Sequence, residues 1–284
     1  MDSPLNLKVP QLLRQYGLRP DKRLGQHFLV NPVALERIVA AAELRPEDQV
    51  LEIGPGVGSL TVHLASRCGR VVAVEVDERL RMVLQRVLQP YPQVEVIFGD
   101  ILQQDPAALM GGAPYRVVAN LPYYITGAVI QHLMDASLRP SRMVLTVQRE
   151  VAARLTAPPG KMSLLSVSVQ VFGAVRTVLR LPPGAFYPPP EVASAVVRVD
   201  MYPQPLVPEA QLPLFFRLAR AAFAHRRKNL RNNLAAGLGW SKAEAEALLR
   251  EAGIAPTQRA EALSMAQWQA LTAAYAALQA KDSA

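Results

Sequence analysis

A glycine-rich segment that follows an apolar run limits the folds open to this chain more than any other feature. Residues 50–53 read as a buried strand and run into the segment 54–58 (GPGVG), after which a helix is expected at 59–67. Glycines at the start of a helix let the backbone approach a bound ligand closely. The pattern therefore predicts a strand, a ligand-binding loop and a helix, the repeating unit of an open α/β sheet.

The composition of this loop indicates the kind of ligand. A glycine loop alone also fits nucleotide-binding proteins, but no lysine stands near Gly54 and Gly56 to bind phosphates. Glu52, two residues before the first glycine, suits a ligand that carries positive charge. We therefore expect Gly54 and Gly56 to contact S-adenosylmethionine.

Two later strands are also followed by acidic residues. The strand expected at 71–74 ends at Glu75, which is placed to accept the ribose hydroxyls of the cofactor. The strand at 94–98 is followed by Asp100, which can accept from the adenine amino group of the cofactor. Asp77 precedes the next helix and is expected mainly to cap it. One acidic residue at a strand end is often only a loop cap, whereas functional residues at successive strand ends favour a cofactor site.

The chemistry is indicated by residues 120–123 (NLPY), which follow an expected strand at 115–119. The Asn120 side-chain oxygen and the Leu121 carbonyl can accept the two N–H bonds of an exocyclic amino group such as adenine N6. Tyr123 can stack on the base and stabilise the positive charge that develops during methyl transfer. The alternative is an ordinary strand-to-helix loop, and the accompanying cofactor motifs favour the methylation site.

Three further strands complete the expected sheet, at 142–147, within 164–178 and at 193–199. This layout, with its late hairpin, indicates an α/β fold, a Rossmann-like seven-stranded class I methyltransferase domain. Between the last two strands, the proline-rich segment 181–190 is expected to present Phe186 or Tyr187 as a fixed platform. A base held between Tyr123 and Phe186 would gain stacking of about 1–3 kcal/mol per face. The alternative is that Phe186 belongs to the core.

A change in composition marks a second domain. Prolines between 203 and 208 form a linker, and the Ala- and Leu-rich sequence beyond it predicts a small C-terminal all-α domain at 208–284. The S-adenosylmethionine-dependent methyltransferase domain is then expected at 1–207, with residues 1–30 as a basic N-terminal lid segment over the cofactor, whose basic residues face RNA. The alternative for this segment is an ordinary amphipathic entry segment.

The charge of the chain favours nucleic acid as a partner. The formal net charge is +8 and the pI is near 9.9, although a basic solvated surface without a partner is the alternative. No acidic residue lies between Glu209 and Glu244. We expect phosphate contacts, and hence RNA binding by this helical domain, from the basic residues in between: Arg217, Arg220, Arg226, Arg227, Lys228 and Arg231.

Other functions lack the residues that they need. Cys68 is the single cysteine and the four histidines show no metal-ligand spacing, so neither a disulfide framework nor a metal is expected. No apolar run is long enough to span a membrane, and the first residues lack the pattern of a signal peptide. We therefore expect a cytoplasmic enzyme.

Five segments of this chain together resemble one family, and the resemblance covers nearly the full length. They are residues 24–29 (LGQHFL), 52–56 (EIGPG), 120–126 (NLPYYIT), 186–192 (FYPPPEV) and 223–228 (FAHRRK). The family that they resemble is the small-subunit (16S) rRNA adenine N6,N6-dimethyltransferases of the KsgA/RsmA type.

This resemblance implies a reaction and a set of contacts. The reaction is dimethylation, with S-adenosylmethionine, of N6 of two adjacent adenosines in the hairpin near the 3′ end of 16S rRNA, in small-subunit biogenesis. The implied cofactor contacts are His27, Leu29, Gly54, Glu75, Asp100 and Asn120. The implied target-base contacts are Asn120, Leu121, Tyr123 and Phe186. The family often has Asn where this chain has His27, which changes the hydrogen-bonding group at that position.

Other functions stay open at this point. One is a large-subunit rRNA adenine dimethylase of the macrolide-resistance type, and another is a mainly non-catalytic checkpoint factor in ribosome assembly. The full C-terminal domain with its segment 226–228 favours the small-subunit type, and the intact cofactor motifs favour catalysis. A glutamine-N5 protein methylase typically has Pro where this chain has Leu121. We expect 16S rRNA or a precursor of the 30S subunit as the partner, and a monomeric protein.

Overall fold

The structure, a computed structural model, describes residues 6–282, so the first five residues of the expected lid segment lie outside the described part. It forms two compact units. The first comprises the chain up to Ala152 together with Val175–Met201, and the second comprises Ala153–Ala174 together with the chain from Tyr202 on. The segment 153–174, which the change in composition near residue 208 assigns to the methyltransferase domain, thus groups with the C-terminal helices.

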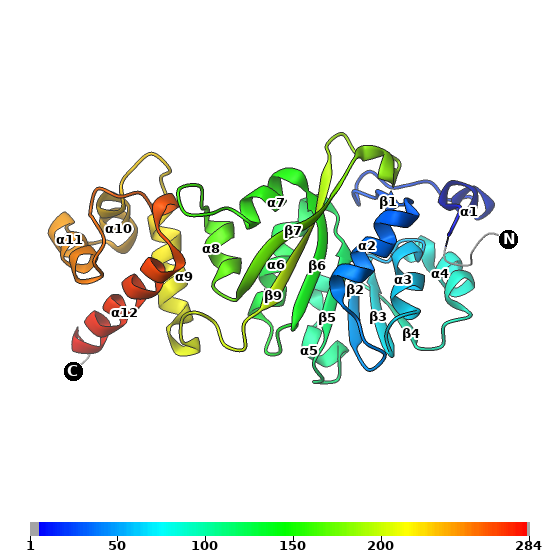
Figure 1. The fold of residues 1–284 in the computed structure, drawn as a ribbon, viewed down its shortest axis with the longest axis horizontal. Coiled ribbons are helices and arrows are strands. Elements are labelled where there is room, and N and C mark those ends of the chain that lie inside the picture. Colours follow the sequence, from blue (N-terminus) through cyan, green and yellow to red (C-terminus); the bar gives the residue numbers. More distant parts are fainter. Residues whose placement is uncertain (1–5, 283–284) are drawn as a thin grey trace. The chain divides into compact units, whose positions relative to one another are not determined.

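The first unit is built on a seven-stranded sheet with the strand order β4-β3-β2-β5-β6-β9-β7 (Figure 1). Its strands are β2 (Gln49–Ile53), β3 (Arg70–Glu75), β4 (Val94–Phe98), β5 (Arg116–Asn120), β6 (Arg142–Gln148), β7 (Gly173–Leu181) and β9 (Ser194–Met201). Strands β2 to β6 run parallel, whereas β9 runs antiparallel to β6. The expected α/β sheet with a late antiparallel strand is confirmed.

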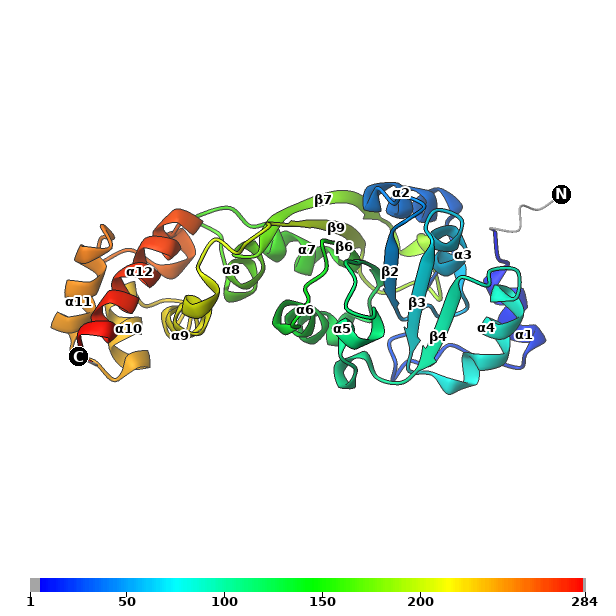
Figure 2. The same ribbon diagram turned by 90° about the horizontal axis from the view of Figure 1, so that it is seen from below.

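Helices cover both faces of this sheet. They are α1 (Val9–Gln15), α2 (Pro32–Ala42), α3 (Ser59–Ala65), α4 (Arg81–Leu88), α5 (Pro106–Leu109), α6 (Thr126–Asp135) and α7 (Arg149–Leu155), whose last residues belong to the second unit. Helices α2 and α3 pack against Val50, Val118 and Val144 of the central strands. Figure 2 shows α6 on the opposite side of the sheet. Because both faces are covered, the central parallel strands are apolar nearly throughout.

One expected strand is partly a helix. The apolar pattern at 164–178 predicts a strand, but Leu164–Gln170 forms helix α8, and β7 begins only at Gly173. The helix begins with a capping box, in which the Ser163 hydroxyl accepts from the Ser166 backbone N–H and the Ser166 hydroxyl accepts from the Ser163 N–H. The prediction was wrong because β-branched residues favour strands only weakly, and capping together with packing outweighs that preference.

The second unit is helical. Besides α8 it contains α9 (Leu212–Ala222), α10 (Leu230–Leu238), α11 (Lys242–Glu251) and α12 (Met265–Asp282). Trp268 is fully buried among them, with Phe223 stacked on it at 5.8 Å and Phe215 edge-on at 6.1 Å between ring centroids. These aromatic rings therefore form a core and stabilise the helical packing.

Candidate active site

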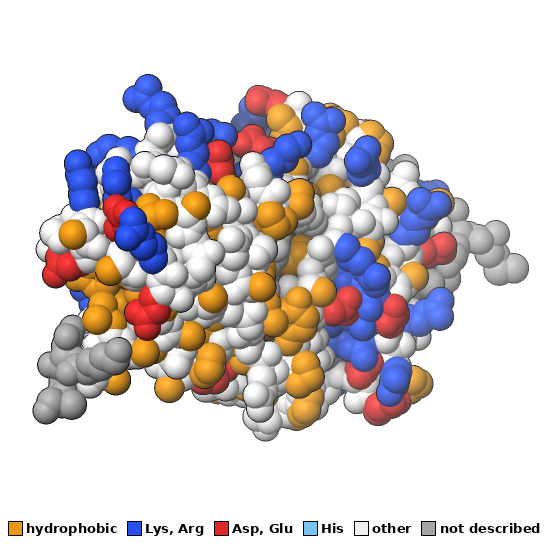
Figure 3. Space-filling view, turned by 60° about the vertical axis from the view of Figure 1, so that its left-hand side comes forward, with side chains coloured by type: hydrophobic (Ala, Val, Ile, Leu, Met, Phe, Trp, Pro, Cys, Tyr) orange, Lys and Arg blue, Asp and Glu red, His pale blue; other side chains and the backbone are white. Residues whose placement is uncertain are grey.

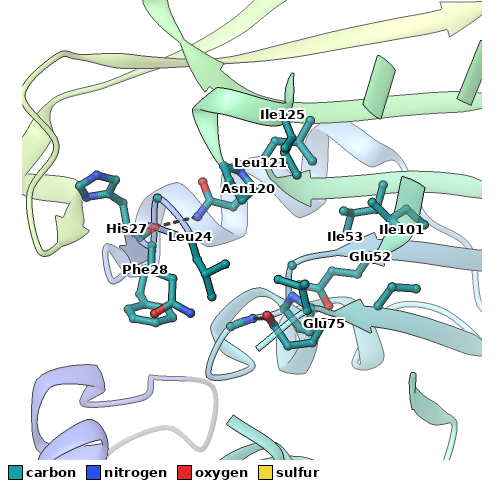
Figure 4. Close-up of a pocket in the computed structure, with 18 of the residues that line it drawn as sticks. Leu24, His27, Phe28, Glu52, Ile53, Glu75, Ile101, Asn120, Leu121 and Ile125 are labelled. Carbon is teal, nitrogen blue, oxygen red and sulfur yellow. Dashed lines mark hydrogen bonds between the residues drawn. The ribbon is translucent and has the colours of Figure 1, made fainter. Parts of the chain in front are cut away.

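Most of the residues predicted to bind the cofactor and the base lie around one cavity at the carboxyl edge of the parallel strands (Figure 4). The cavity is lined by His27, Leu29, Gly54, Gly56, Glu75, Asp100, Asn120, Leu121 and Tyr123. Those from Gly54 to Tyr123 come together because β2, β3, β4 and β5 are parallel and end at the same edge of the sheet, whereas His27 and Leu29 belong to the N-terminal segment, which lies against that edge. Each strand is followed by a loop that carries one of the predicted motifs, as is usual for ligand sites in open α/β sheets.

The loop after β2 needs its glycines for two reasons. Gly54 and Gly56 have positive φ angles of 72° and 61°, a region that other residues rarely adopt. A Cβ atom at position 56 would also lie 2.8 Å from the ring of Phe28, so the N-terminal segment packs directly on this loop. The Gly56 N–H donates to Oε2 of Glu75 at 2.9 Å, which ties the loop to the end of β3.

Two carboxyl groups that line the cavity are buried, since Glu52 is 1% and Glu75 is 4% exposed. Burial raises the pKa of Glu75, although its oxygens accept backbone N–H bonds from Gly56 and Asp77. Burial also raises the pKa of Glu52 to about 8, and its Oε2 has no hydrogen-bond partner among the described residues. This part of the cavity therefore suits a ligand that brings hydroxyl donors or positive charge.

Two side-chain hydrogen bonds tie the N-terminal segment to the edge of the sheet. Nδ2 of Asn120 donates to the backbone carbonyl of His27 at 2.9 Å, and Nε2 of Gln26 donates to Oδ2 of Asp77 at 2.7 Å. Asp77 also accepts from the Arg79 backbone N–H at 3.1 Å, which is the capping role predicted for it. The segment thus lies against both the cofactor loops and the NLPY motif.

The residues predicted to bind the target base have hydrogen-bond acceptors that remain free to bind an amino group. Figure 4 shows the bond from Asn120 to His27 that engages the amide nitrogen, and no donor to the Asn120 Oδ1 is found within residues 6–282. The Leu121 N–H donates to the Thr146 carbonyl at 3.2 Å, which fixes the backbone of the motif. The ring of Tyr123 lies against that of His27, with centroids 5.8 Å apart and planes 23° apart.

Phe186 lies apart from these residues. Its side chain is 4% exposed, packs in the core with Leu29 and Val196, and is not among the residues that line the cavity. It belongs to the short strand β8 (Phe186–Tyr187), which pairs antiparallel with β1 (Phe28–Leu29). The side chain thus occupies the core position that the sequence left as the alternative, and a role in base stacking stays a prediction.

Known proteins with similar sequences agree with this geometry. The family model described as "Ribosomal RNA adenine dimethylase" matches residues 18–277. The chain belongs to this family. A relative from Dehalococcoides mccartyi, named "Ribosomal RNA small subunit methyltransferase A", is 46% identical over 272 residues, which cover 95% of this chain and 94% of the relative. A relative with the same name from Pelotomaculum thermopropionicum is 43% identical over 276 residues, which cover 93% of this chain and 94% of the relative.

Two solved structures extend the similarity to the fold. The 23S rRNA methyltransferase ErmE is similar with a TM-score of 0.72 and 30% identity, covering 87% of this chain and 98% of that one. A dimethyladenosine transferase from Plasmodium falciparum is similar with a TM-score of 0.73 and 25% identity, covering 86% and 96%. The Rossmann-like class I methyltransferase fold with a C-terminal helical region is therefore confirmed.

S-adenosylmethionine is the methyl donor of this family, and the cavity fits it. Gly54 and Gly56 line the cavity without side chains, and the unpartnered oxygen of Glu52 is suited to a positively charged group. Glu75 and Asp100 line the same cavity at the ends of β3 and β4, where they can accept from the ribose and the adenine. The cofactor supplies a methyl group activated by attachment to a sulfonium.

Three residues at the site were not among the predicted ones. Gln26 bonds to Asp77, Ile101 lines the cavity after β4, and the Ser194 hydroxyl lies 2.7 Å from that of Tyr123. Gln26 and Ile101 adjoin predicted residues in the sequence, so a search of the neighbouring positions includes them. Ser194 is far from Tyr123 along the chain, and no local pattern indicates that the two meet.

The second unit carries the basic residues predicted to contact RNA. Residues 226–228 are exposed in the turn between α9 and α10, and Arg217 and Arg220 are exposed on α9. Arg231 is half-buried and forms an ion pair with Glu246 at 3.2 Å, so part of its charge is neutralised. In Figure 3, Lys and Arg side chains gather on this unit at the upper left. Residues 226–228, Arg217 and Arg220 are therefore the exposed members of the predicted set, and their phosphate contacts stay a prediction.

Three observations concern a cysteine nucleophile, a metal site and a membrane span. Cys68 is buried, its thiol donates to the Leu64 carbonyl at 3.3 Å, and burial raises its pKa to about 11, so it is not a reactive nucleophile. No cluster of three or more potential metal ligands occurs within residues 6–282. In the same range, no helix has the length and apolar character needed to cross a membrane.

Proposed function

We propose that this protein uses S-adenosylmethionine to dimethylate N6 of two adjacent adenosines in the hairpin near the 3′ end of 16S rRNA, in small-subunit biogenesis. The observation that carries the proposal is the Asn120 amide, whose nitrogen is bonded to the His27 carbonyl at 2.9 Å so that its oxygen is left to accept from an amino group. The relatives from D. mccartyi and P. thermopropionicum, both named small subunit methyltransferase A, support the choice of rRNA.

The proposed reaction is a direct in-line transfer. In the first transfer, Oδ1 of Asn120 and the carbonyl of Leu121 accept the two N6–H bonds, which localises the lone pair on the nitrogen. In the second transfer one N6–H is left, and one of these two acceptors binds it. With S-adenosylmethionine held in the cavity, its sulfonium would supply the methyl group to N6 and would keep the electron pair of the carbon–sulfur bond, and an N6 proton would pass to water. Tyr123 stacks on the base and stabilises the positive charge, so positioning and electrostatics supply the catalysis.

Incubation of the protein with labelled S-adenosylmethionine and 30S subunits from a strain that lacks this methylation tests the proposal. We expect the label in N6,N6-dimethyladenosine at two adjacent positions. Asn120→Ala is expected to lower kcat at least about 100-fold with little change in thermal stability, because it removes an acceptor that acts in the transition state. Gln131→Ala, which removes an exposed amide bonded to Asp135, is the matched control and keeps its turnover. Near-normal turnover of Asn120→Ala would contradict the assignment.

Dimethylation of large-subunit rRNA is the less favoured alternative, because ErmE, a 23S rRNA methyltransferase, is 30% identical whereas the two relatives named small subunit methyltransferase A are 46% and 43% identical. Parallel incubation with 23S rRNA separates the two substrates, since label in 23S rRNA alone would favour the large-subunit one.

The other alternative is a role mainly as an assembly checkpoint. It predicts that a strain with Asn120→Ala matures its 30S subunits better than a deletion strain does. The 30S precursor as partner, the monomeric state and the cytoplasmic location stay predictions, which cosedimentation with precursor particles, light scattering and cell fractionation would check.

A further inference from the structure

Ser194 is a buried residue at the edge of the sheet that the chemistry described above does not use. It begins β9 and pairs with Gln148, the last residue of β6, so it lies at the same edge as the NLPY motif. Its exposed fraction is 0%, and its Oγ lies 2.7 Å from Oη of Tyr123. Within residues 6–282, no other partner of the Ser194 hydroxyl is found. The one hydrogen bond of this hydroxyl is therefore directed at the ring predicted to stack on the target base.

The ring of Tyr123 is half-buried in the cavity wall and stacks against His27, with 5.8 Å between ring centroids. The residue begins a 3₁₀ turn at Tyr123–Ile125, for which Pro122 provides no side-chain cap, and the following Tyr124 is 62% exposed. The hydroxyl at the tip of the Tyr123 ring is consequently the point at which this side chain is hydrogen-bonded to the sheet.

The hydrogen bond between the hydroxyls of Tyr123 and Ser194 is expected to persist in solution. Burial raises the pKa of Tyr123, so its hydroxyl stays protonated at neutral pH, and either oxygen can donate to the other. Because Ser194 is fully buried, its hydroxyl has no access to water that would replace the bond.

We infer that Ser194 is a positioning residue for methyl transfer, because it fixes the tip of the Tyr123 ring and thereby sets the plane on which the target adenine stacks. The inference rests on the proposed function. The orientation of the Tyr123 ring plane matters more for the second transfer than for the first. A base that already carries one methyl group is bulkier, and its N6 can accept the second methyl group only when the first one points away from the methyl donor. A ring that is free to tilt therefore slows the second transfer most.

Three variants test this inference: Ser194→Ala, Tyr123→Phe and the double variant. For each we would measure kcat, the KM for S-adenosylmethionine and the ratio of monomethylated to dimethylated adenosine. Each single variant is expected to lower kcat about tenfold, to leave the KM for S-adenosylmethionine unchanged and to accumulate monomethyladenosine. The double variant is expected to be no worse than either single one, because all three lack the same bond, whereas additive losses would contradict the inference.

Tyr115→Phe is the matched control. Tyr115 is buried, and its Oη donates to the carbonyl of Leu138 at 3.0 Å, so the variant also removes a buried phenol hydrogen bond. Tyr115 does not line the cavity. We expect this variant to lose thermal stability and to keep the product ratio of the wild type. A Ser194→Ala protein that behaves in the same way would overturn the inference, because its effect would then be structural.

Fluorine NMR on protein that contains 3-fluorotyrosine gives a readout without any substrate. The Tyr123 resonance, assigned by its loss in Tyr123→Phe, is expected to broaden or split in Ser194→Ala and to stay unchanged in Tyr115→Phe. A wild-type resonance, kcat and product ratio in Ser194→Ala would overturn the inference. A wild-type protein that methylates neither 16S nor 23S rRNA would overturn the proposed function instead, and the resonance alone would then decide whether Ser194 holds the ring.

Discussion

Of the glycines that line the cavity, Gly56 tolerates a side chain least, because its φ is 61° and a Cβ atom there would lie 2.8 Å from the Phe28 ring. We predict that Gly56→Ala lowers the free energy of unfolding by about 1–3 kcal/mol, because the backbone is strained and Phe28 must move. The affinity for S-adenosylmethionine is expected to fall at least about tenfold, since the displaced ring belongs to the cavity wall. Urea unfolding and calorimetric titration measure the two effects.

Gly127→Ala is the control for this prediction. Gly127 lies in α6, where a Cβ would meet no atom within 4 Å. Alanine is favoured in helices, so the variant is expected to keep its stability or gain up to about 1 kcal/mol. Equal losses in the two variants would contradict the steric explanation for Gly56.

Glu52 makes the stability of the cofactor-free protein depend on pH. Burial raises its pKa from 4.5 to about 8, so the folded state binds this proton more tightly than the unfolded state does. The stability from this group is therefore complete below about pH 4.5 and is lost as the pH rises toward 8, with a slope of at most about 1.4 kcal/mol per pH unit.

Glu52→Gln tests this dependence, because a glutamine does not ionise. We predict that the variant becomes more stable relative to the wild type as the pH rises from 4.5 to 8. Urea unfolding at several pH values measures the difference, and Glu36→Gln, at an exposed position of α2, is the control. If the free energy of unfolding changes with pH in the same way for the wild type and for Glu52→Gln, then a group other than Glu52 binds the proton.

At the scale of elements, the turn between α9 and α10 is held from inside by Asn233. Its side chain is 1% exposed, and Nδ2 donates to the carbonyls of Ala222 at 2.7 Å and His225 at 3.0 Å. These bonds turn the carbonyls inward while residues 226–228 stay exposed. We predict that Asn233→Ala lowers the free energy of unfolding by about 2 kcal/mol and weakens RNA binding although it removes no charge. Thermal unfolding and filter binding measure the two effects.

Asn232→Ala is the neighbouring control. Oδ1 of Asn232 has no hydrogen-bond partner in the described part of the chain, so its removal breaks no such bond to the turn. We expect wild-type RNA affinity for this variant. If Asn233→Ala also binds RNA as the wild type does, the shape of the turn is not what presents residues 226–228 to RNA.

At the scale of the whole molecule, the net charge of +8 predicts RNA binding that weakens as salt is added. Replacing residues 226–228 by alanine is expected to reduce the slope of log affinity against log salt by about 2, because fewer counterions are released from phosphates. Arg231→Ala is expected to change the slope less than a single substitution in that turn does, because Arg231 is paired with Glu246. Filter binding at several salt concentrations measures the slopes, and equal effects of all four positions would contradict a special role for the turn.

The sequence by itself determined the succession of most strands along the chain, the glycine loop and the acidic residues that follow β3 and β4. These signals are local, because an apolar run, a turn residue and a helix cap each lie within a few neighbouring positions. Since parallel strands end at one edge of a sheet, the residues after them meet around one cavity, and their positions were predictable without coordinates.

Only the tertiary structure decided which side chains meet across long stretches of chain. It places Phe186 in the core through the pairing of β8 with β1, makes Leu164–Gln170 a helix, and brings Ser194 to the hydroxyl of Tyr123. These contacts depend on the packing of segments that are distant in sequence, and such packing leaves no periodic pattern in either segment. The sequence thus determines where the cofactor loops lie, and the packing of distant segments determines how the aromatic residues near them are held.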